Sequence, residues 1–369
     1  MIEEYFDITI IGAGVSGLIL ANEITERTNN KVLLIEKKTK FEFDKNLCFW
    51  SIPKNFLTDF ADNRWSELCV YINNKKINLS SDGIEYLRIK SSNFYRIFLD
   101  KLKKRKNFKL LLGHSIKSVD SDRNRVAITI GDKNFYSKVC FDSRIEKAYE
   151  NIELLQHFYG AEIEFESNVT NNSLTLMDIQ DNKKEFHFMY ILPLSKKKIF
   201  IESTYFSKKI FKKNKYKEDL YKYLKNKYED KKYKINFSEF GKIPMFRLNE
   251  FNSRNHIKIG TAGNWVRQST GYSLQNAFEY SSQIVDCILK GKNLQIKKSS
   301  FLNYLDNTFC IFLKNNPEKS ALFFEKFYKK NKLINIVNFL TNKAGIIELL
   351  KIIVSLPKFE LIKTVLTKK

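Results

Sequence analysis

A carboxylate inside an apolar segment is the first candidate for chemistry in this 369-residue chain. Glu202 stands in the run IFIESTYF, residues 199–206. Burial favours the neutral form of a carboxylic acid, and a neutral acid in a dry pocket can deliver a proton to a carbon–carbon double bond. A second interpretation stays open, because Ile199, Ile201 and Ser203 would share one face of a half-buried strand and leave Glu202 pointing to solvent.

A glycine-rich turn near the N-terminus has the pattern of a dinucleotide-binding motif. It follows the apolar run 6–11 and precedes a helical pattern. A second apolar run, 31–36, ends on Glu36 at about the 20-residue spacing that this motif requires. The glycines would permit a tight turn, close approach of a pyrophosphate and helix packing, while Glu36 would bind a ribose. The three glycines at GxGxxG spacing are Gly12, Gly14 and Gly17.

Two later segments could return to the nucleotide. One strand pattern ends at Asp142 in CFDSR, and another ends in GTAGN, where Gly260 and Gly263 precede a helical pattern. The alternatives are an ordinary strand-end carboxylate for Asp142 and an ordinary strand–helix turn for the glycines. The chain has no second GxGxxG motif, which favours FAD over NAD by analogy with two-domain flavoproteins.

Residues 154–206 have mainly β patterns. The runs at 185–195 and 198–206 predict an antiparallel pair joined by a lysine-rich turn. Residues 215–229 predict a helix with one apolar side, formed by Tyr216, Leu220, Tyr223 and Leu224. Beyond residue 300 the patterns predict helices that either cap the sheet or lie at a membrane interface. There are four such helical runs, the last ended by Pro357: 300–313, 318–331, 332–342 and 345–356.

The composition limits the possible partners. Lys and Arg number 64 against 41 Asp and Glu, a net charge of +23, which can reflect either an anionic membrane surface or a codon bias toward lysine. No nucleic-acid-binding module is recognisable, so no nucleic-acid partner is expected. The abundance of aromatic residues, 31 Phe and 18 Tyr, favours a bulky core or a cavity for a flat, apolar molecule.

Cysteine usage indicates a reducing compartment, with neither a disulfide framework nor a metal site. There is no CxxC pair among the five cysteines, Cys48, Cys69, Cys140, Cys287 and Cys310. The sequence shows no signal peptide and no continuous apolar run of about 18 residues, so no membrane-spanning helix is expected.

Taken in order, these motifs resemble the lycopene cyclase family, in its bacterial β-ring-forming type. The glycine motif is shared by many flavoproteins, whereas the order of LQHFYG, LMD, YILPLS, FIEST, IPM and STGY is far more specific. The resemblance covers most of the chain and includes DITIIGAGVSGLILA, NLCFW, CFDSR, LQHFYGAEIE, LMD, YILPLS, FIESTYFS, GKIPM, GTAGNWVRQSTGYSLQ and FFEKFY.

The resemblance implies an α/β fold: a Rossmann-type FAD-binding domain with an inserted, mainly β substrate domain, followed here by a C-terminal helical cap. Mapped onto the patterns, the FAD-binding domain comprises 1–60, 91–150 and 241–298. The substrate domain comprises 61–90 and 151–240, and the helical cap comprises 299–369.

The resemblance also implies lycopene as substrate, reduced FAD as cofactor, and NAD(P)H as the expected electron source for a reaction with no net redox change. Protonation of a terminal double bond gives a cation, the neighbouring alkene closes a six-membered ring, and loss of a ring proton gives a β-ring. By its place in FIEST, Glu202 would be the acid or base. Phe158, Tyr205 and Phe206 are candidates to stabilise the cation, and Asp178 in LMD is a further pocket candidate.

Two other functions stay open at this point. A flavin monooxygenase or prenyl reductase with an apolar substrate would consume NADPH in proportion to its product. A non-catalytic carotenoid-binding flavoprotein would bind pigment and leave it unchanged. The sequence also leaves open whether one or two rings are closed and whether the ring is β or ε. The expected location is cytoplasmic and peripheral to the inner membrane, where lycopene dissolves.

Overall fold

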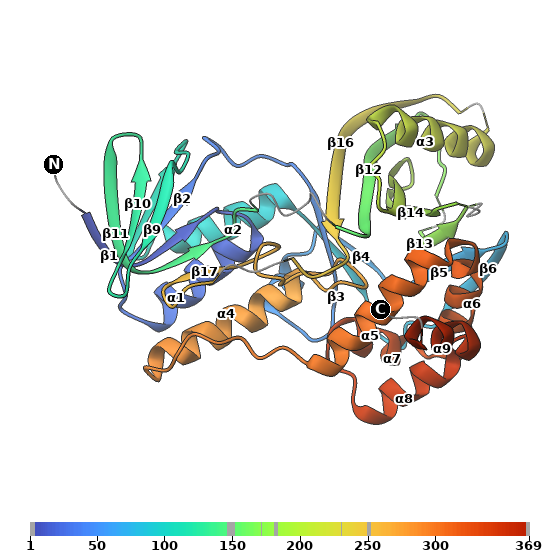
Figure 1. Cartoon of the computed structure of the whole chain (residues 1–369). Helices are drawn as coiled ribbons and strands as arrows, with labels where there is room; N and C mark the ends of the chain where they lie inside the picture. The colour runs from blue at the N-terminus through green and yellow to red at the C-terminus, as the bar shows by residue number, and fades with distance from the viewer. Residues whose placement is uncertain are drawn as a thin grey trace.

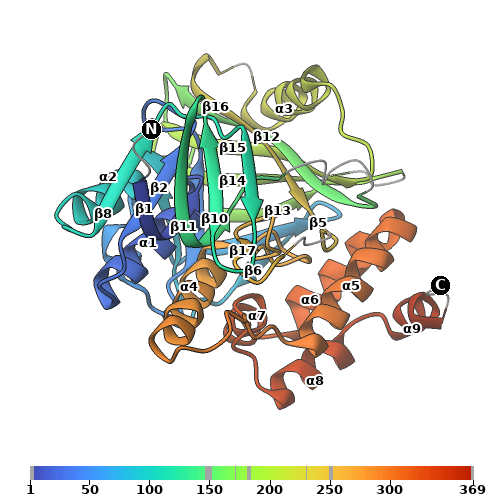
Figure 2. The ribbon, with the colours of Figure 1, turned by 60° about the vertical axis from the view of Figure 1, so that its left-hand side comes forward.

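Two large sheets lie side by side in the computed structural model, with a small sheet between them and helices over their faces (Figure 1). The structure describes residues 4–145, 152–170, 172–180, 184–229, 231–248 and 252–366. The N-terminal half supplies most of the first sheet, and the C-terminal helices gather below the second sheet (Figure 2).

The first sheet has a parallel core. Five of its strands (β8, β2, β1, β11 and β17) run parallel, while β10 and β9 turn back as an antiparallel meander. Parallel neighbours need a crossover connection, and a helix supplies it between β1 and β2. In the described residues the order is β8 (Phe108–Leu112), β2 (Val32–Glu36), β1 (Glu4–Ile11), β11 (Lys133–Asp142), β10 (Val126–Ile130) and β9 (Ser118–Ser121), with β17 (His256–Lys258) beside β11.

Both faces of this parallel core are buried, which explains why its strands read as almost continuous apolar runs. On one face Ile8 and Ile10 share a core with three helices. On the other face Ile11 packs with Val126 and Ile128 of the meander. The helices are α1 (Val15–Arg27), α2 (Ser91–Leu102) and α4 (Leu274–Leu289).

The second sheet is antiparallel except where β13 and β5 run parallel. The antiparallel pair predicted from residues 185–195 and 198–206 is confirmed, and Tyr190 lies opposite Glu202 in it. In the described residues the order is β16 (Tyr233–Pro244), β12 (Leu155–Phe165), β15 (Lys198–Ser207), β14 (Phe186–Ser195), β13 (Leu174–Ile179), β5 (Leu68–Ile72) and β6 (Lys75–Leu79).

Side chains of the second sheet alternate between two layers. Along β15, Ile199 and Ile201 pack under α3 (Lys213–Tyr228), whereas Phe200 and Phe206 face the C-terminal helices. The helix predicted at 215–229 is confirmed as α3. Its buried residues are the four predicted ones, Tyr216, Leu220, Tyr223 and Leu224.

The small sheet joins segments from both sides of the boundary expected after residue 60. Its order is β3 (Asn46–Trp50), β7 (Tyr86–Lys90) and β4 (Asn63–Trp65), with both outer strands antiparallel to β7. A short 3-10 helix, η1 (Phe56–Phe60), lies between β3 and β4 in the chain. This sheet therefore connects the two large ones.

The C-terminal helices pack against the second sheet rather than apart from it. Phe186 of β14 stacks on Phe324 with ring centroids 5.1 Å apart. A fifth helix follows Pro357, where the sequence predicts an end, because proline is tolerated at a helix start. The elements are α5 (Ser300–Asn315), η2 (Pro317–Lys319), α6 (Ser320–Lys330), α7 (Leu333–Leu340), α8 (Ile346–Ser355) and α9 (Lys358–Leu366).

Two buried histidines stabilise the layer between the second sheet and α3. His157 Nδ1 lies 2.6 Å from Tyr216 Oη, and His187 Nε2 lies 3.0 Å from Ser203 Oγ. The His187 ring also stacks on Tyr205 with centroids 4.0 Å apart. Burial lowers the pKa of each histidine from 6.5 to about 4, because desolvation disfavours the charged imidazolium.

We therefore expect the contribution of these two histidines to the free energy of unfolding to fall as the pH drops from about 6.5 to about 4. In this window the unfolded chain binds protons that the folded chain does not, at up to about 1.4 kcal/mol per pH unit for each histidine. Urea unfolding at several pH values should show that the free energy of unfolding of His187→Phe, relative to that of the parent, rises as the pH drops through this window. The exposed His114→Phe is the control and should keep the parental slope; equal slopes in all three proteins would contradict the assignment.

Candidate active site

The glycine turn after β1 has the close contacts that its spacing predicts. Gly12 has a φ of +95°, and a Cβ there would lie 2.1 Å from Ser143 Oγ. A Cβ on Gly17 would lie 2.0 Å from the carbonyl oxygen of Gly12, so α1 packs directly on the turn. A Cβ on Gly14 would have no atom within 4 Å, so the turn is open where a ligand would approach the helix N-terminus.

Glu36 lies beside this turn at the end of β2. Its Oε2 accepts a hydrogen bond from Ala13 N at 2.7 Å, and its Oε1 accepts one from Lys38 N at 2.9 Å. In this described part of the chain, no side chain caps α1 and no acidic residue lies in its first turn. The open N–H groups at Gly14 could bind a pyrophosphate, with the Glu36 carboxylate close enough for a ribose.

The second glycine turn contacts the first. Gly260 follows β17 with a φ of +61°, and a Cβ there would lie 3.2 Å from Ser16 Oγ at the start of α1. A Cβ on Gly263 would lie 2.2 Å from the carbonyl oxygen of Lys258, so this turn is also closely packed. The two turns therefore meet at the carboxyl ends of parallel strands, the edge where ligands bind in such sheets.

Asp142, the last residue of β11, lies at the same edge of the sheet, but its carboxylate binds neighbouring side chains of this protein. It accepts hydrogen bonds from Arg144 Nη2 at 2.8 Å and Lys258 Nζ at 3.0 Å, and His256 Nε2 lies 3.1 Å away. Burial acts to raise its pKa, but hydrogen bonds from His256 and Arg144 outweigh burial and hold the pKa well below its usual range. Asp142 thus fixes the ends of β11 and β17 relative to each other.

A cavity of about 650 Å³ lies between the second sheet and the C-terminal helices, a size typical of small-molecule sites. Residues 269–272, which follow the second glycine turn, also line it, so it extends to the first sheet's side of the molecule. Its walls are mainly aromatic and aliphatic. The aromatic lining residues include Phe158, Phe200 and Phe206 from the sheet and Phe309, Phe323, Phe324, Phe327 and Phe339 from the helices.

Glu202 lines this cavity from β15. It is 8% exposed, and its Oε1 accepts a hydrogen bond from Thr204 Oγ1 at 2.6 Å. Burial raises the pKa of Glu202 to about 8, despite the opposing effect of that hydrogen bond. Of the two interpretations that the sequence leaves open, the structure therefore favours the buried, protonated acid.

A second carboxylate, Glu239 of β16, lines the same cavity and was not found from the sequence. Its Oε2 accepts a hydrogen bond from the backbone N of Asn46 at 2.9 Å. Burial raises its pKa to about 7, while hydrogen bonds from Asn46 and the charges of Lys45 and Arg88 act in the opposite direction. In β16 (YKINFSEFGKIP) polar residues are interspersed with apolar ones, as in a surface strand, and this conceals Glu239; its place two residues before Gly241 of the GKIPM motif was the available signal.

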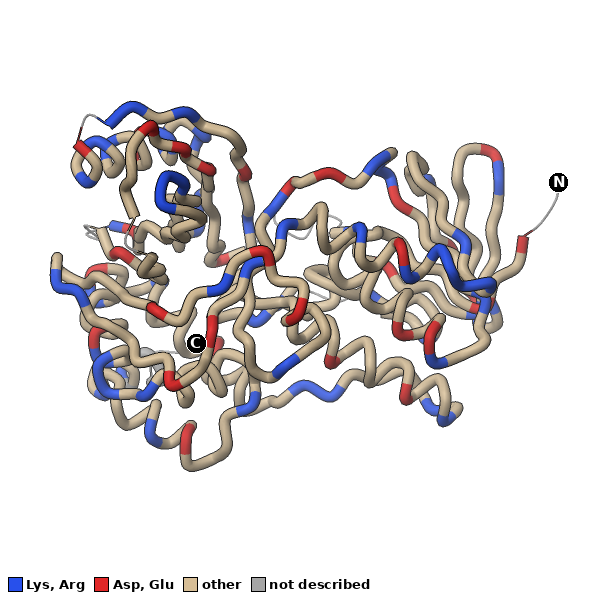
Figure 3. Tube along the Cα trace, turned by 180° about the vertical axis from the view of Figure 1, so that it is seen from behind, with Lys and Arg blue, Asp and Glu red and all other residues tan. Residues whose placement is uncertain are grey.

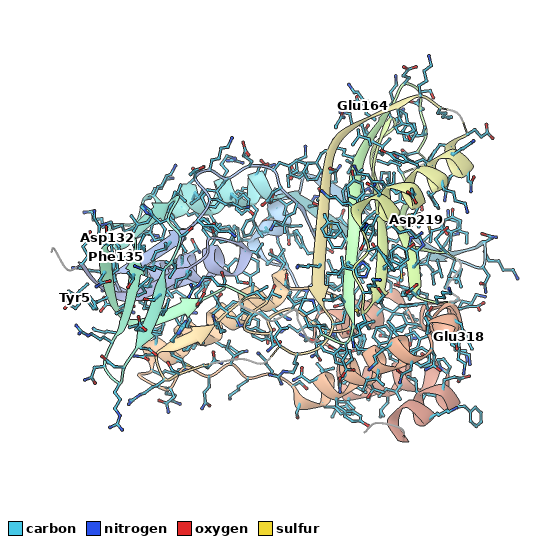
Figure 4. The ribbon with its side chains drawn as sticks, turned by 45° about the horizontal axis from the view of Figure 1, so that its top comes forward. Tyr5, Asp132, Phe135, Glu164, Asp219 and Glu318 are labelled. Atoms are coloured by element: carbon cyan, nitrogen blue, oxygen red, sulfur yellow. The ribbon has the colours of Figure 1, made fainter. Side chains whose placement is uncertain are left out.

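Of the predicted pocket residues, Phe158 and Phe206 line the cavity, whereas Asp178 and Tyr205 do not. Tyr205 lies on the α3 face, where its hydroxyl donates to Asp219 Oδ2 at 2.7 Å; Figure 4 shows Asp219 on α3 beside the sheet. Asp178 accepts a hydrogen bond from Tyr223 Oη of α3 at 2.5 Å.

The expectation for both residues is therefore corrected, for two physical reasons. Tyr205 is an odd-numbered residue of β15 and alternation places it opposite to Glu202. In β13 the register shifts between Thr175 and Asp178, so the neighbours Leu176 and Met177 both line the cavity and Asp178 points to the α3 side.

Three tyrosine hydroxyls lie close together in the part of the cavity next to residues 269–272. Tyr190 Oη donates to Tyr86 Oη at 3.2 Å, and Tyr86 Oη lies 3.4 Å from Tyr272 Oη. Burial raises the pKa of all three phenols, that of Tyr272 to about 12, so the group stays neutral. Gln156 Oε1 is buried there with no hydrogen-bond partner in the described residues, next to Gly271, whose φ is +74°. A buried acceptor without a partner could bind an N–H group of a ligand that reaches the cavity from the glycine turns.

Two kinds of site are not found in the described residues. No group of three His, Cys, Asp or Glu side chains there could hold a metal ion. No helix among those described is both long enough and apolar enough to cross a bilayer.

Comparison with protein-family models matches residues 7–366 to the family described as lycopene cyclase protein. No curated protein matches the chain. A geranylgeranyl bacteriochlorophyll reductase-like protein from Thermoplasma acidophilum is similar in structure, with a TM-score of 0.64, 12% identity and 98% of each chain covered.

Two further solved structures are similar to the chain. A flavoprotein/dehydrogenase from Cytophaga hutchinsonii gives a TM-score of 0.64 at 14% identity, covering 92% of this chain and 93% of the other. The flavin-dependent brominase Bmp2 gives 0.62 at 14% identity, covering 91% and 93%. The α/β fold with a Rossmann-type domain, a mainly β domain and C-terminal helices is thus the fold of FAD-dependent flavoproteins.

Gly17 is the most closely packed glycine of the first turn and Gly14 is the most open, so the two should respond differently to substitution by alanine. Gly17→Ala should lower the stability of the flavin-free protein by about 1–3 kcal/mol, because its Cβ meets the backbone of Gly12. Gly14→Ala has free space and should keep the parental melting temperature, yet bind FAD at least ~10-fold more weakly, because the pyrophosphate approaches there. Thermal unfolding and fluorescence titration with FAD measure both; parental FAD affinity in Gly14→Ala would contradict this site.

Proposed function

The chain belongs to the lycopene cyclase protein family, and we propose that it is a lycopene β-cyclase that converts linear end groups of lycopene to β-rings. The product would be β-carotene, formed through γ-carotene, with no net redox change. One observation carries the proposal: Glu202, a buried carboxyl with a pKa of about 8, lines a cavity with aromatic and aliphatic walls. At neutral pH this group is mostly protonated and can act as an acid toward a hydrocarbon.

The residues of the cavity account for the steps of such a reaction. Glu202 donates its proton to the terminal double bond, and Thr204 holds the carboxyl in place by its hydrogen bond. The tertiary cation is attacked by the neighbouring alkene, which closes the ring, and a ring proton is lost. Phe158 and Phe206 line the cavity, where aromatic rings would stabilise a cation, and mainly apolar walls would disfavour the water that would trap it.

We propose reduced FAD as the cofactor, with NAD(P)H as its source of electrons. The two glycine turns and Glu36 would hold it, and Gln156 lies where its ring would reach the cavity. Bound reduced FAD would supply negative charge close to the carbocation. The loop 269–272 links the turn at Gly260 to the cavity wall, so the nucleotide and substrate sites share one backbone segment.

A flavin monooxygenase or a prenyl reductase is the alternative enzyme, because the similar structures include a geranylgeranyl bacteriochlorophyll reductase-like protein and a flavin-dependent brominase. Either would change the mass of the substrate and consume reduced nicotinamide with each product molecule. A non-catalytic carotenoid-binding flavoprotein would leave both unchanged. A cyclase converts its substrate to a product of the same mass but different structure. Mass and structure of the product therefore distinguish the three functions by experiment.

Glu202→Gln should abolish cyclisation, because the amide has no acidic proton to give. We expect lycopene-accumulating bacterial cells that express the parent chain to form β-carotene, and cells that express Glu202→Gln to keep lycopene, with at least a ~100-fold loss. Pigment chromatography with mass spectrometry measures this.

The exposed Glu218→Gln on α3 is a matched control and should convert lycopene like the parent. Full conversion by Glu202→Gln would remove the acid from the mechanism. Unchanged lycopene with a folded, FAD-loaded parent protein would reject the cyclase and favour the alternatives.

We also propose that the protein associates peripherally with the cytoplasmic face of the inner membrane through α8 and the start of α9. One side of α8 lines the cavity through Leu349 and Ile352, while the other leaves Ile346 79% exposed and Ile347 70% exposed. Phe359 of α9 is 87% exposed. Helix α8 is thus apolar on both sides, and one of these sides is exposed to solvent. Such a helix is suited to lie in the interface of a bilayer.

Charge around this face supports a lipid surface as its partner. Lys351 on α8 and Lys358 at the start of α9 are exposed beside the apolar residues. Lys and Arg lie along most of the trace, including the C-terminal helices, and the whole chain carries +23 (Figure 3). Anionic headgroups attract such lysines while the apolar side chains insert. Because α8 separates lipid from cavity, this face would also admit a substrate dissolved in the membrane.

Charged substitutions on this face should weaken membrane binding. Ile347→Glu combined with Leu350→Glu should reduce co-sedimentation with phosphatidylglycerol-containing vesicles by about 10-fold or more, because both exposed side chains lose apolar contact with lipid. Leu289→Glu is the control for one added charge away from this face, since Leu289 at the end of α4 is as exposed as Leu350, 55% each. Equal vesicle binding by the double variant and the parent would contradict this docking face.

A further inference from the structure

Four strands of the second sheet place central residues in one row across the cavity floor. Tyr190 of β14 pairs with Glu202 of β15, Glu202 with Gly160 of β12, and Gly160 with Glu239 of β16. Residues paired across a sheet point to the same face, and Tyr190, Glu202 and Glu239 all line the cavity. Two carboxylates therefore flank one glycine.

The space above this glycine holds an aromatic ring. A Cβ on Gly160 would lie 2.3 Å from Phe200 Cζ and 2.9 Å from Cε2, so the Phe200 ring lies directly on β12. Two strand spacings, about 9.5 Å, separate the Cα atoms of Glu202 and Glu239. An end group that rests on the Phe200 ring would thus have one carboxylate on each side.

The two carboxylates have different surroundings. Glu202 accepts a hydrogen bond from the Thr204 hydroxyl, whereas Glu239 accepts one from the Asn46 backbone and is influenced by the charges of Lys45 and Arg88. Burial raises the pKa of both, to about 8 for Glu202 and about 7 for Glu239. Two acids whose surroundings separate their affinities for a proton are suited to opposite roles.

We propose that Glu239 is the proton acceptor of the cyclisation and that Phe200 supports the cationic ring between acid and acceptor. This inference rests on the proposed cyclase function. The proton that enters and the proton that leaves lie on different carbons of the same six-membered ring, so two groups on opposite sides serve better than one. An aromatic ring at the midpoint between the two carboxylates would stabilise such a cation.

The step balances without any other reactant. The O–H bond of Glu202 breaks as a C–H bond forms at the terminal alkene carbon, and the ring C–C bond then closes. A ring C–H bond breaks, its electron pair forms the ring double bond, and its proton goes to Glu239. Glu202 is left as a carboxylate and Glu239 as an acid, and return of the proton from Glu239 to Glu202 restores the site for the next end group.

The pH dependence of the rate follows from these roles. Glu202 must be protonated and Glu239 ionised, so the rate should be highest between about pH 7 and 8, rising with the ionisation of Glu239 and falling with that of Glu202. Other charged or titratable groups lie around this row on the elements packed against it: Lys45 before β3, Cys48 on β3, Tyr86 and Arg88 on β7, Glu162 on β12, Tyr272 of the 269–272 loop, Tyr304 on α5 and Tyr328 on α6.

The test compares three variants of the full-length, FAD-loaded protein with lycopene in liposomes. In Glu239→Gln we expect the initial rate to fall at least ~100-fold, with flavin content and bound lycopene unchanged. The residual product should contain rings with the double bond displaced, because the proton is then lost from another carbon. Glu239→Asp keeps a carboxylate and should recover part of the rate and the parental double-bond position. Glu218→Gln is the matched control.

Each outcome decides the inference. A changed double-bond position in Glu239→Gln, and restoration by Glu239→Asp, support it, because a purely structural role would lower the rate without moving the double bond. Parental rate and product in Glu239→Gln overturn it and leave Glu202 to perform both transfers. Loss of lycopene binding in both Glu239 variants also overturns it in favour of a structural role. A parent protein that forms no ring rejects the cyclase function itself, and Glu239 with it.

Discussion

The alternation of side chains along β12, β14 and β15 assigns the residues at the centre of the second sheet to one of two layers. Odd-numbered residues of β15 pack under α3, and even-numbered ones form the cavity floor. Because the register is held by long antiparallel pairs, a slip of one residue would exchange Glu202 with Ser203 and move the acid to the α3 side. The proposed chemistry therefore depends on strand register more than on any single contact.

The first sheet contributes to the site through its edge. Parallel strands bring the turns at Gly12 and Gly260 together, and the ion pairs of Asp142 hold the strand ends between them. From this edge, residues 269–272 reach the cavity and meet Gln156 of β12. A cofactor in the turns and a substrate in the cavity would thus be aligned by a backbone connection rather than by loose domain closure.

Local patterns predicted much of this architecture. The glycine spacing, the β14–β15 pair, the apolar side of α3 and four of the C-terminal helices follow from short-range periodicity. Glu202 was identified because an isolated acid stands out in an apolar run. Glu239 was missed because its importance comes from a strand neighbour far away in sequence. Asp178 and Tyr205 were assigned to the wrong face, since a register shift and the parity of a strand position are visible only once the pairing is known.

The cavity is made of two parts that are far apart along the chain, and this affects how the protein is synthesised. Its sheet floor is complete when β16 ends at Pro244, whereas the helices that cover it begin at Ser300. During translation the phenylalanines of the sheet floor, among them Phe158, Phe200 and Phe206, stay exposed until the ribosome has released α5 to α8. An uncovered aromatic surface of this kind is prone to aggregation. We therefore expect the nascent chain to need protection by a chaperone, or by the membrane surface, over its last hundred or so residues.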